Sequence, residues 1–254
     1  MIAIAIVSQK GGAGKSTLTV HLAVAALRAG RKVAILDTDP QGSAAAWGEV
    51  RADDTPPVVA IAAADIASAL AEARSEGYDV VLIDTQPRAS ASVANLIAAA
   101  DWALIPVRPS VFDITTAEQT QRIVIAAGTP FAFVLNACPA RAPEIAEGRA
   151  VLAQLGSVLD VAIGERRVYG RALQSGQAVQ EFDAQSDAAI EIERAWSEIE
   201  RRSTSNGAQV PQGTPPSSSN PGEGAGTPSS TASTQEGDGP PHPPAMAAAQ
   251  GIRA

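Results

Sequence analysis

The stretch VSQKGGAGKSTLTVHLAV, residues 7–24, joins an apolar run to a helical pattern through a glycine-rich turn. The run before it, IAIAIV at residues 2–7, is short and rich in β-branched side chains, which is typical of a buried strand. Residues 16–29 predict a helix that ends at Gly30. A strand, a glycine-rich turn and a helix in this order are the layout of a phosphate-binding loop.

The turn itself, QKGGAGKS at residues 9–16, matches the phosphate-loop pattern except that Gln9 stands where the pattern usually has glycine. Its glycines would let backbone N–H groups curl around an anion with no Cβ in the way. Lys15 is expected to reach the β- and γ-phosphates of a nucleotide, and Ser16 to offer its hydroxyl to Mg²⁺. The positive end of the following helix would add to this attraction. The glycines concerned are Gly11, Gly12 and Gly14.

Two further strand ends carry carboxylates. The apolar run VVLID ends in Asp84, and AILDTDP supplies Asp37 and Asp39. A single aspartate after a strand is more often a helix cap. Combined with the phosphate loop, however, Asp84 is the aspartate expected to hold Mg²⁺ after a hydrophobic strand.

Short apolar runs alternate with helical patterns along the chain. Continuous apolar strands separated by helices predict a parallel sheet covered on both faces, and right-handed crossovers would make it doubly wound. The predicted fold class is therefore α/β, with a doubly wound, mostly parallel sheet flanked by helices. The predicted strands are residues 2–7, 32–37, 57–62, 78–84, 102–107, 131–137 and 157–163, and the predicted helices are residues 16–29, 65–77, 90–100, 115–127, 143–155 and 187–202.

The composition changes after residue 202 to proline, glycine, serine and threonine, with almost no large apolar residue. Such a segment cannot bury enough surface to offset its ordering entropy. We therefore expect residues 1–202 to form one domain and residues 203–254 to form a disordered tail.

The chain has 254 residues and a net charge of −8, and three acids and one arginine in the tail leave −6 on the rest. This charge argues against strong binding of nucleic acid by the domain as a whole. The single cysteine, Cys138, excludes a disulfide within the chain and a cysteine-rich metal or iron–sulfur site from one chain. No stretch approaches the roughly 20 apolar residues of a membrane span. A cytoplasmic protein is expected.

Lys10 is a second lysine, five residues before Lys15 on a tight turn. It is poorly placed to reach the same phosphates as Lys15. It could instead reach the phosphates of a second copy that faces it across a dyad, in the manner of an arginine finger. The sequence therefore predicts a homodimer that encloses two nucleotides.

Four motifs together resemble those of one family. KGGAGKS, which begins at Lys10, resembles the deviant Walker A box of the ParA/MinD ATPases, and DTDPQGSA at residues 37–44 resembles their switch I. VVLIDTQP at residues 80–87 resembles their Walker B and switch II, and IPVRPSVFD at residues 105–113 resembles a proline-containing loop of the small plasmid-partition ParA proteins. The resemblance covers residues 1–202 and implies a P-loop NTPase of the deviant Walker A type.

The resemblance also implies roles for single residues, with ATP and Mg²⁺ as cofactors. Lys10 would act in trans, Lys15 would hold phosphate, and Asp39 would position or activate the attacking water, so these three are the expected catalytic residues. The expected metal site is Ser16, Asp39 and Asp84, and the expected ATP contacts are Lys10, Gly11, Gly12, Ala13, Gly14, Lys15, Ser16, Thr17 and, on the adenine side, Asn136.

One position departs from the family pattern. Gln86 stands where the family usually has a proline, in the motif Asp-Thr-Gln-Pro that Arg88 follows. This substitution lies in the predicted switch II, the segment that reports the nucleotide state.

Three arginines close together, Arg166, Arg167 and Arg171 in GERRVYGRAL, are the expected DNA-binding residues. Similar late arginines contact the DNA backbone in ParA proteins, and a few phosphate contacts, doubled by dimerisation, suffice for weak, salt-sensitive binding. The alternative is a solvated patch or pairing within the chain to Glu165 and Glu181.

The implied function is partition of plasmid or chromosomal DNA. In this interpretation an ATP-dependent dimer binds DNA non-specifically and works with a ParB-like or centromere-binding partner on the nucleoid. The alternatives are a protein that positions a protein cargo, such as a carboxysome or a chemoreceptor cluster, and a MinD-like membrane-associated regulator. The acidic pattern of residues 187–202 lacks the basic face of a membrane-binding helix, which disfavours the membrane alternative.

Overall fold

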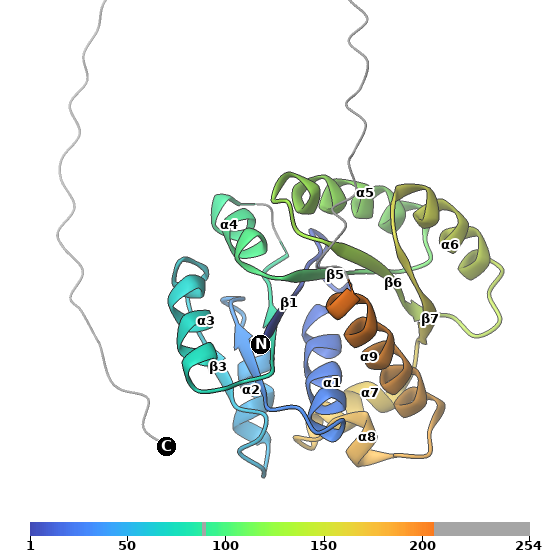
Figure 1. Cartoon of the computed structure of the whole chain (residues 1–254). Helices are drawn as coiled ribbons and strands as arrows, with labels where there is room; N and C mark the ends of the chain where they lie inside the picture. Colours follow the sequence, from blue (N-terminus) through green and yellow to red (C-terminus); the bar gives the residue numbers. More distant parts are fainter. Residues whose placement is uncertain (88–89, 206–254) are drawn as a thin grey trace, which may run out of the picture. The chain divides into compact units, whose positions relative to one another are not determined.

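Seven strands form one sheet in the order β3-β2-β4-β1-β5-β6-β7, and every neighbouring pair is parallel. This computed structural model describes residues 1–87 and 90–205 (Figure 1). Each predicted strand is present, and the predicted α/β fold with a doubly wound parallel sheet is confirmed. The strands are β1 (Ile2–Ile6), β2 (Val33–Asp37), β3 (Val58–Ala60), β4 (Val80–Asp84), β5 (Trp102–Val107), β6 (Phe131–Cys138) and β7 (Val158–Gly164).

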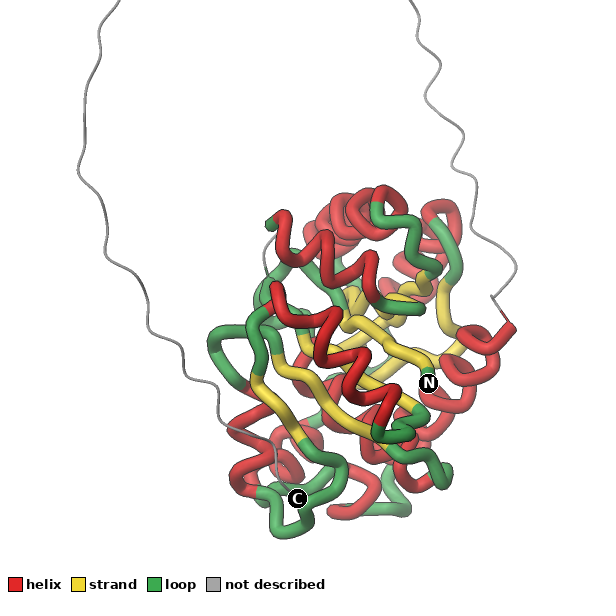
Figure 2. The backbone as a smooth tube through the Cα atoms, turned by 60° about the vertical axis from the view of Figure 1, so that its left-hand side comes forward, coloured by secondary structure: helices red, strands yellow, loops and turns green. Residues whose placement is uncertain are grey.

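Helices cover both faces of the sheet, as Figures 1 and 2 show. The apolar core is accordingly in two parts, one on each face. One face carries α1 (Lys15–Arg28), α2 (Ser43–Val50), α7 (Arg167–Gln174), α8 (Val179–Phe182) and α9 (Asp187–Ser205). The other face carries α3 (Ile66–Ser75), α4 (Ala91–Ala99), α5 (Val111–Ala126) and α6 (Glu144–Leu155). A short 3₁₀ turn, η1 (Ala63–Asp65), precedes α3.

The strands at the centre of the sheet explain why the molecule folds this way. All residues of β2, β4 and β5 are buried, so their side chains contact a helical layer on either face. Parallel strands of this kind consist of nearly continuous β-branched and aliphatic residues, as observed here. The order places β1 between β4 and β5, so the chain after β1 emerges at the middle of the carboxyl edge.

Three helices were not predicted, namely α2, α7 and α8. Helix α2 begins after a turn because the Asp37 carboxylate at the end of β2 accepts hydrogen bonds from the N–H groups of Ala44 and Ala45, both at 2.9 Å. A cap supplied from a neighbouring strand end leaves no local signal in the helix sequence.

Two helix boundaries also differ from the prediction. Helix α5 begins at Val111 and not at residue 115, because the Ser110 hydroxyl accepts a hydrogen bond from the Asp113 N–H at 3.2 Å. Helix α9 continues to Ser205, three residues beyond the predicted end. The predicted tail therefore loses its first three residues to this helix, and its remainder, residues 206–254, lies outside the described residues.

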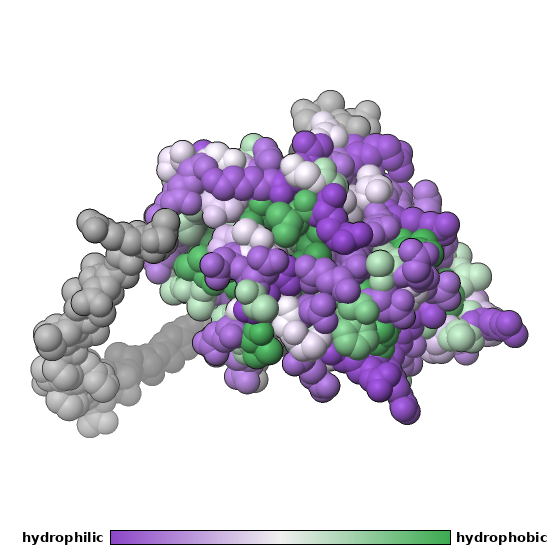
Figure 3. Space-filling view, turned by 90° about the horizontal axis from the view of Figure 1, so that it is seen from below, coloured by the Kyte–Doolittle hydropathy of each residue, from purple (hydrophilic) through white to green (hydrophobic). Residues whose placement is uncertain are grey.

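Viewed from below in Figure 3, most of the surface is hydrophilic and its apolar patches are small and separate. Among the described residues, no helix combines the length and the apolar character that crossing a membrane requires.

Candidate functional site

The sheet register brings the phosphate loop, the Asp37–Asp39 motif and Asp84 to one edge of the sheet. Ile6 at the end of β1 pairs with Asp84 at the end of β4, and Asp84 pairs in turn with Asp37 at the end of β2. The predicted phosphate loop, residues 9–16, begins three residues after Ile6. The carboxyl ends of the strands of an open parallel sheet are where ligands bind, at the point where the strand order reverses. Asp37 and Asp84 therefore lie at the edge of the sheet where the predicted phosphate loop begins.

The phosphate loop has the backbone shape that its glycines allow. Gly12 and Gly14 have φ angles of 75° and 89°, in the left-handed region. The Asn136 side chain at the end of β6 donates a hydrogen bond from Nδ2 to the Ala13 carbonyl oxygen at 2.7 Å, and a Cβ on Gly14 would lie only 2.3 Å from that Nδ2. Gly14 is therefore required both by its backbone conformation and by the close approach of Asn136.

Asn136 was predicted on the adenine side of the site. Its Nδ2 holds the phosphate loop, which is a function that the sequence did not indicate. Its Oδ1 makes no hydrogen bond with any described residue, so an adenine contact through that oxygen stays a prediction. The remaining predicted nucleotide contacts lie in the same loop and in the first turn of α1: Gly11, Ala13, Ser16 and Thr17.

Lys15 is buried in the first turn of α1, with only 6% of the residue exposed. Its ammonium group makes no ion pair and no hydrogen bond within the described part of the chain. Burial lowers the pKa of this ammonium, and the nearby carboxylates of Asp84 and Asp39 oppose that shift. A desolvated cation at the positive end of a helix is suited to bind an anion.

Asp84 is fully buried, and neither of its carboxylate oxygens has a hydrogen-bond partner among the described residues. Burial raises the pKa of this carboxyl to about 7, although the neighbouring Ser16 hydroxyl and Lys15 lower it. Ser16 is therefore close enough to act on Asp84 but does not complete a hydrogen bond in the geometry observed. Two unsatisfied buried carboxylate oxygens beside a serine hydroxyl fit a divalent cation such as Mg²⁺.

A metal ion at this position would need ligands from outside the protein. The described residues contain no group of three or more histidine, cysteine, aspartate or glutamate side chains that could hold a metal ion by themselves. Phosphate oxygens of a nucleotide normally complete the Mg²⁺ shell of such sites. The donors present at the site, Ser16 and Asp84, therefore fit a metal bound together with a nucleotide.

The two aspartates of the second motif have different surroundings. Asp37 is buried and uses both carboxylate oxygens within the protein, accepting hydrogen bonds from the Asp39 N–H at 3.0 Å and from the start of α2. Asp39 is half-buried, and its Oδ1 accepts a hydrogen bond from the Gln41 N–H at 3.0 Å. Asp37 therefore has a structural function, and Asp39 is the carboxylate of this motif that remains accessible.

The Lys10 side chain pairs with a carboxylate of its own chain. Its ammonium lies 2.7 Å from the Asp113 Oδ1 in the first turn of α5, and the Ser110 hydroxyl donates to the other oxygen of the same carboxylate. The sequence motif ending at Asp113 was recognised, but nothing in it indicated this ion pair.

The arginines predicted to bind DNA fall into two groups. The Arg166 guanidinium pairs with Glu191 at 2.7 Å and with Asp187 at 3.4 Å, so it is already neutralised. Arg167 and Arg171 are exposed on α7, four residues apart, and neither has an ion-pair partner in the described residues. Helical spacing places these two on the same face.

The acids considered as alternative partners are not paired with these arginines. Glu181 forms an ion pair with Arg51 at 2.7 Å instead. Glu165 forms no ion pair with any residue that the structure describes. The pairing of Arg166 with α9 was not predicted. Of the three arginines predicted to bind DNA, Arg167 and Arg171 remain available for that contact.

The predicted switch II is described in part. Gln86 donates a hydrogen bond from Nε2 to the Ser90 hydroxyl at 3.4 Å, and Ser90 caps α4. Arg88 lies outside the described residues.

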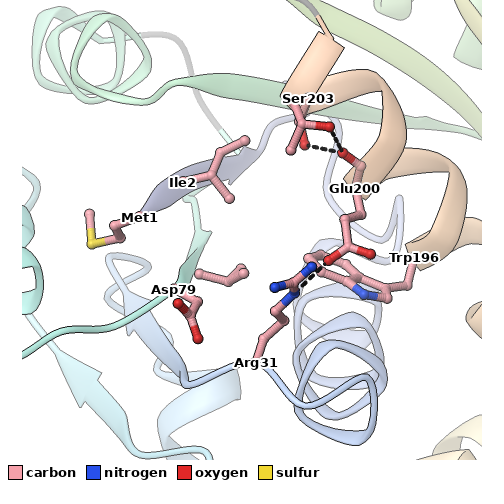
Figure 4. A pocket seen from close by; sticks show the side chains of 9 residues that line it. Met1, Ile2, Arg31, Asp79, Trp196, Glu200 and Ser203 are labelled. Atoms are coloured by element: carbon pink, nitrogen blue, oxygen red, sulfur yellow. Dashed lines mark hydrogen bonds and ion pairs between the residues drawn. The ribbon is translucent and has the colours of Figure 1, made fainter.

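A separate cavity of about 280 Å³ lies at the opposite, amino edge of the sheet (Figure 4). The Arg31–Glu200 ion pair crosses it at 2.7 Å, and Trp196 and the start of β1 form part of its wall. None of the predicted site residues lines this cavity.

This fold and this loop define a class of protein, the P-loop nucleotide-binding proteins. The family model of the CobQ/CobB/MinD/ParA nucleotide binding domain matches residues 4–56. Maintenance of carboxysome distribution protein A of Gloeobacter kilaueensis is 31% identical over 208 residues, which cover 76% of this chain and 94% of the relative. Protein ParA of Rhizobium radiobacter is 30% identical over 212 residues, covering 77% and 93% respectively. The chain belongs to the ParA/MinD family of P-loop NTPases.

The fold agrees with solved structures. The septum site-determining protein MinD of Pyrococcus horikoshii OT3, solved in complex with Mg-ADP, matches with a TM-score of 0.66 at 19% identity over 79% of this chain and 96% of that chain. The family assignment from the four motifs is therefore confirmed by the comparisons, and the fold by this structural likeness.

Proposed function

We propose that this chain is an ATP-dependent, dimer-forming ATPase that binds DNA non-specifically and partitions plasmid or chromosomal DNA with a ParB-like or centromere-binding partner protein. The observation that carries the proposal is the pair of opposite charges at the loop, the Lys15 ammonium and the Asp84 carboxylate. Both are buried, and they form no ion pair with each other. Burying an ammonium and a carboxyl that lack hydrogen-bond partners among the described residues costs free energy, which a bound phosphate and its metal ion would offset.

In this proposal each residue at the site has a defined task. Lys15 and the backbone N–H groups of the loop hold the β- and γ-phosphates, while Ser16 and Asp84 hold Mg²⁺ together with Asp39, directly or through water. Bound Mg²⁺ neutralises charge on the phosphate oxygens. Asp39 is accessible and orients the water that attacks the γ-phosphate.

The proposed catalytic unit is a homodimer, in which Lys10 of each copy approaches the nucleotide of the other. An added cation would stabilise the charge that develops on the transferred phosphoryl group. Lys10 must leave Asp113 to do this. Forty per cent of the Lys10 side chain is exposed, so the ammonium can move without opening the core.

For DNA we propose that Arg167 and Arg171 contact backbone phosphates. Their common face on α7 and their lack of partners among the described residues support this assignment. The net charge of −8 makes binding weak and salt-sensitive, as suits a protein that must leave DNA after hydrolysis. The protein would then work in the cytoplasm, associated with the nucleoid.

A second candidate function is the positioning of a protein cargo on the nucleoid. It is favoured by the likeness to a maintenance of carboxysome distribution protein along 94% of that relative. Both candidate functions use ATP, a homodimer and non-specific DNA binding. They differ in the partner that stimulates hydrolysis. Capture of the bound partner from the native cells distinguishes them. A MinD-like membrane function is disfavoured, since four of the first twelve residues of α9 are Asp or Glu.

A DNA-shift assay tests the proposal. The protein is mixed with a DNA fragment of arbitrary sequence and ATP, ADP or no nucleotide, at a low and a high salt concentration. We expect a shift only with ATP and mainly at low salt, and none for Lys15→Ala under any condition. A shift that does not depend on nucleotide, or that Lys15→Ala retains, would contradict the proposal.

A further inference from the structure

The end of β5 and the start of α5 supply two contacts to the phosphate loop. At one, Asp113 in the first turn of α5 pairs with Lys10. At the other, the Arg108 guanidinium lies beside Gly12. Its Nη2 is 3.9 Å from the position that a Cβ on Gly12 would occupy. Both points involve a cation beside the loop, but only the first is balanced by a carboxylate.

The backbone position of Arg108 is fixed by its buried neighbours in the chain. It follows β5, which pairs with β1 and whose Leu104 carbonyl accepts a hydrogen bond from the Val7 N–H at 2.9 Å. Pro109 comes next, and the Ser110 N–H donates to the Arg108 carbonyl oxygen at 2.8 Å, which closes a tight turn. Proline fixes one backbone angle of this turn. The side chain therefore starts from a fixed backbone next to the loop.

The charge of Arg108 is not neutralised within the described part of the chain. Its side chain is exposed and makes no hydrogen bond or ion pair there. The acidic groups of the site interact with other residues: Asp113 pairs with Lys10 and accepts a hydrogen bond from Ser110, while Asp84 and Asp39 act on Lys15.

Other arginines of the molecule are also exposed, but their surroundings differ. Arg122 on α5 has 73% of its side chain exposed and pairs with Glu118 at 2.6 Å. Arg108, in contrast, stands beside a glycine whose backbone is available to an anion. A guanidinium presents a planar fork of donors that matches two oxygens of a phosphate.

We propose that Arg108 is a phosphate-contacting residue, whose guanidinium binds the phosphate chain of a nucleotide held by the loop of its own molecule. This inference rests on the proposed function for the presence of that nucleotide. It adds a cation supplied by the β5–α5 segment to the Lys15 of the loop, and it needs no dimer.

Equilibrium binding of fluorescent ATPγS and ADP tests the inference, at protein concentrations where the chain is a monomer. Removal of a charge-assisted hydrogen bond to a phosphate should raise the Kd of Arg108→Gln about ten-fold. Arg108→Lys keeps the charge but not the planar fork of donors, so its Kd should lie between that of Arg108→Gln and that of the wild type. Arg122→Gln removes a charge from the helix that follows Arg108 and should bind like the wild type. The thermal unfolding midpoint should not change, because Arg108 has no partner among the described residues.

An unchanged Kd for Arg108→Gln would overturn the inference, and so would an equal loss for Arg122→Gln, since that would indicate a general charge effect. Two further proteins separate this failure from failure of the proposed function. If the wild type binds ATPγS and Lys15→Ala does not, the phosphate site is real and only the assignment of Arg108 is at stake. If the wild type does not bind either nucleotide, the proposed function itself fails.

Discussion

The Lys10 ammonium lies 2.7 Å from the Asp113 carboxylate of the same molecule. Asp113 is nearly buried, with 7% of its side chain exposed, and it also accepts a hydrogen bond from Ser110. A pair with one buried member is screened less by solvent than a surface pair. In the structure Lys10 is thus held by an ion pair within its own chain.

The first prediction concerns release of Lys10 by Asp113→Asn. If Lys10 acts on the nucleotide of a second copy, the ion pair within the chain competes with the dimer. Removing the carboxylate should therefore increase the fraction of dimer several-fold with a non-hydrolysable ATP analogue, while the Kd for nucleotide stays unchanged. An exposed ion pair stabilises the state that contains it by up to about 1 kcal/mol, and the Lys10–Asp113 pair is partly buried. Light scattering coupled to size exclusion measures the fraction.

Glu118→Gln is the matched control, because it removes from the same helix a carboxylate whose ion-pair partner among residues 1–87 and 90–205 is the exposed Arg122. It should leave the dimer fraction as in the wild type. If Asp113→Asn lowers the dimer fraction, Asp113 positions Lys10 for the partner and does not compete with it.

The second prediction concerns the contact between Gly14 and Asn136. Alanine at position 14 would have to adopt a φ of 89° and would place its Cβ 2.3 Å from the Asn136 Nδ2. We expect Gly14→Ala to lower the free energy of unfolding by about 1–3 kcal/mol without nucleotide. Urea unfolding measures this loss.

Gly11→Ala is the control for this prediction, since a Cβ at position 11 has no atom within 4 Å. It should change the unfolding free energy by less than about 0.5 kcal/mol. Adding Asn136→Ala to Gly14→Ala should cost less than the sum of the single changes, because the close contact disappears and only the backbone strain remains. Strict additivity of the two changes would rule out the contact as the cause.

Much of the fold could be predicted because its signals are local. Each strand is a short apolar run with a turn signal after it, and the phosphate loop consists of adjacent residues. Parallel pairing then places the strand ends Asp37 and Asp84 at one edge, where the structure has them in register. The alternation of strands and helices is enough to bring the loop and its carboxylates together.

The unpredicted contacts depend on which elements are neighbours. Lys10 meets Asp113 only because β1 pairs with β5, and the sequence does not reveal that strand order. Arg166 meets Glu191 because the start of α7 packs beside α9. The start of α5, in contrast, did have a local signal that was missed, since Ser110 and Asp113 have the spacing of an N-terminal cap.

The third prediction concerns pH and the buried His21 on α1. Burial lowers the pKa of this imidazole from 6.5 to about 3. Its Nδ1 accepts a hydrogen bond from the Val179 N–H at 3.1 Å, and its Nε2 has no partner among the described residues. The unfolded chain therefore binds a proton at higher pH than the folded chain does. This part of the stability is complete above about pH 6.5 and is lost as the pH falls toward 3, by up to about 1.4 kcal/mol per pH unit.

The test compares urea unfolding of the wild type and His21→Asn between neutral and mildly acidic pH. Asparagine keeps an acceptor near Val179 but does not titrate, so its curve should fall less steeply by about one proton. It should be less stable than the wild type at neutral pH, because a smaller side chain leaves a cavity. Equal slopes for the two proteins would show that His21 is protonated at the same pH folded and unfolded.

The fourth prediction concerns DNA and α7. Arg167→Gln with Arg171→Gln removes two exposed charges from one helical face, so ATP-dependent affinity for DNA should fall at least ten-fold. The slope of log K against log salt should also become shallower, by about 0.9 for each DNA phosphate that the protein no longer neutralises. Fluorescence anisotropy with labelled DNA at several salt concentrations measures both quantities.

Arg74→Gln with Arg122→Gln is the matched control for α7. It removes the same charge from α3 and α5, on the opposite face of the sheet, and should leave affinity and slope nearly unchanged. Equal decreases in affinity for the two double variants would mean that total charge, and not α7, governs DNA binding.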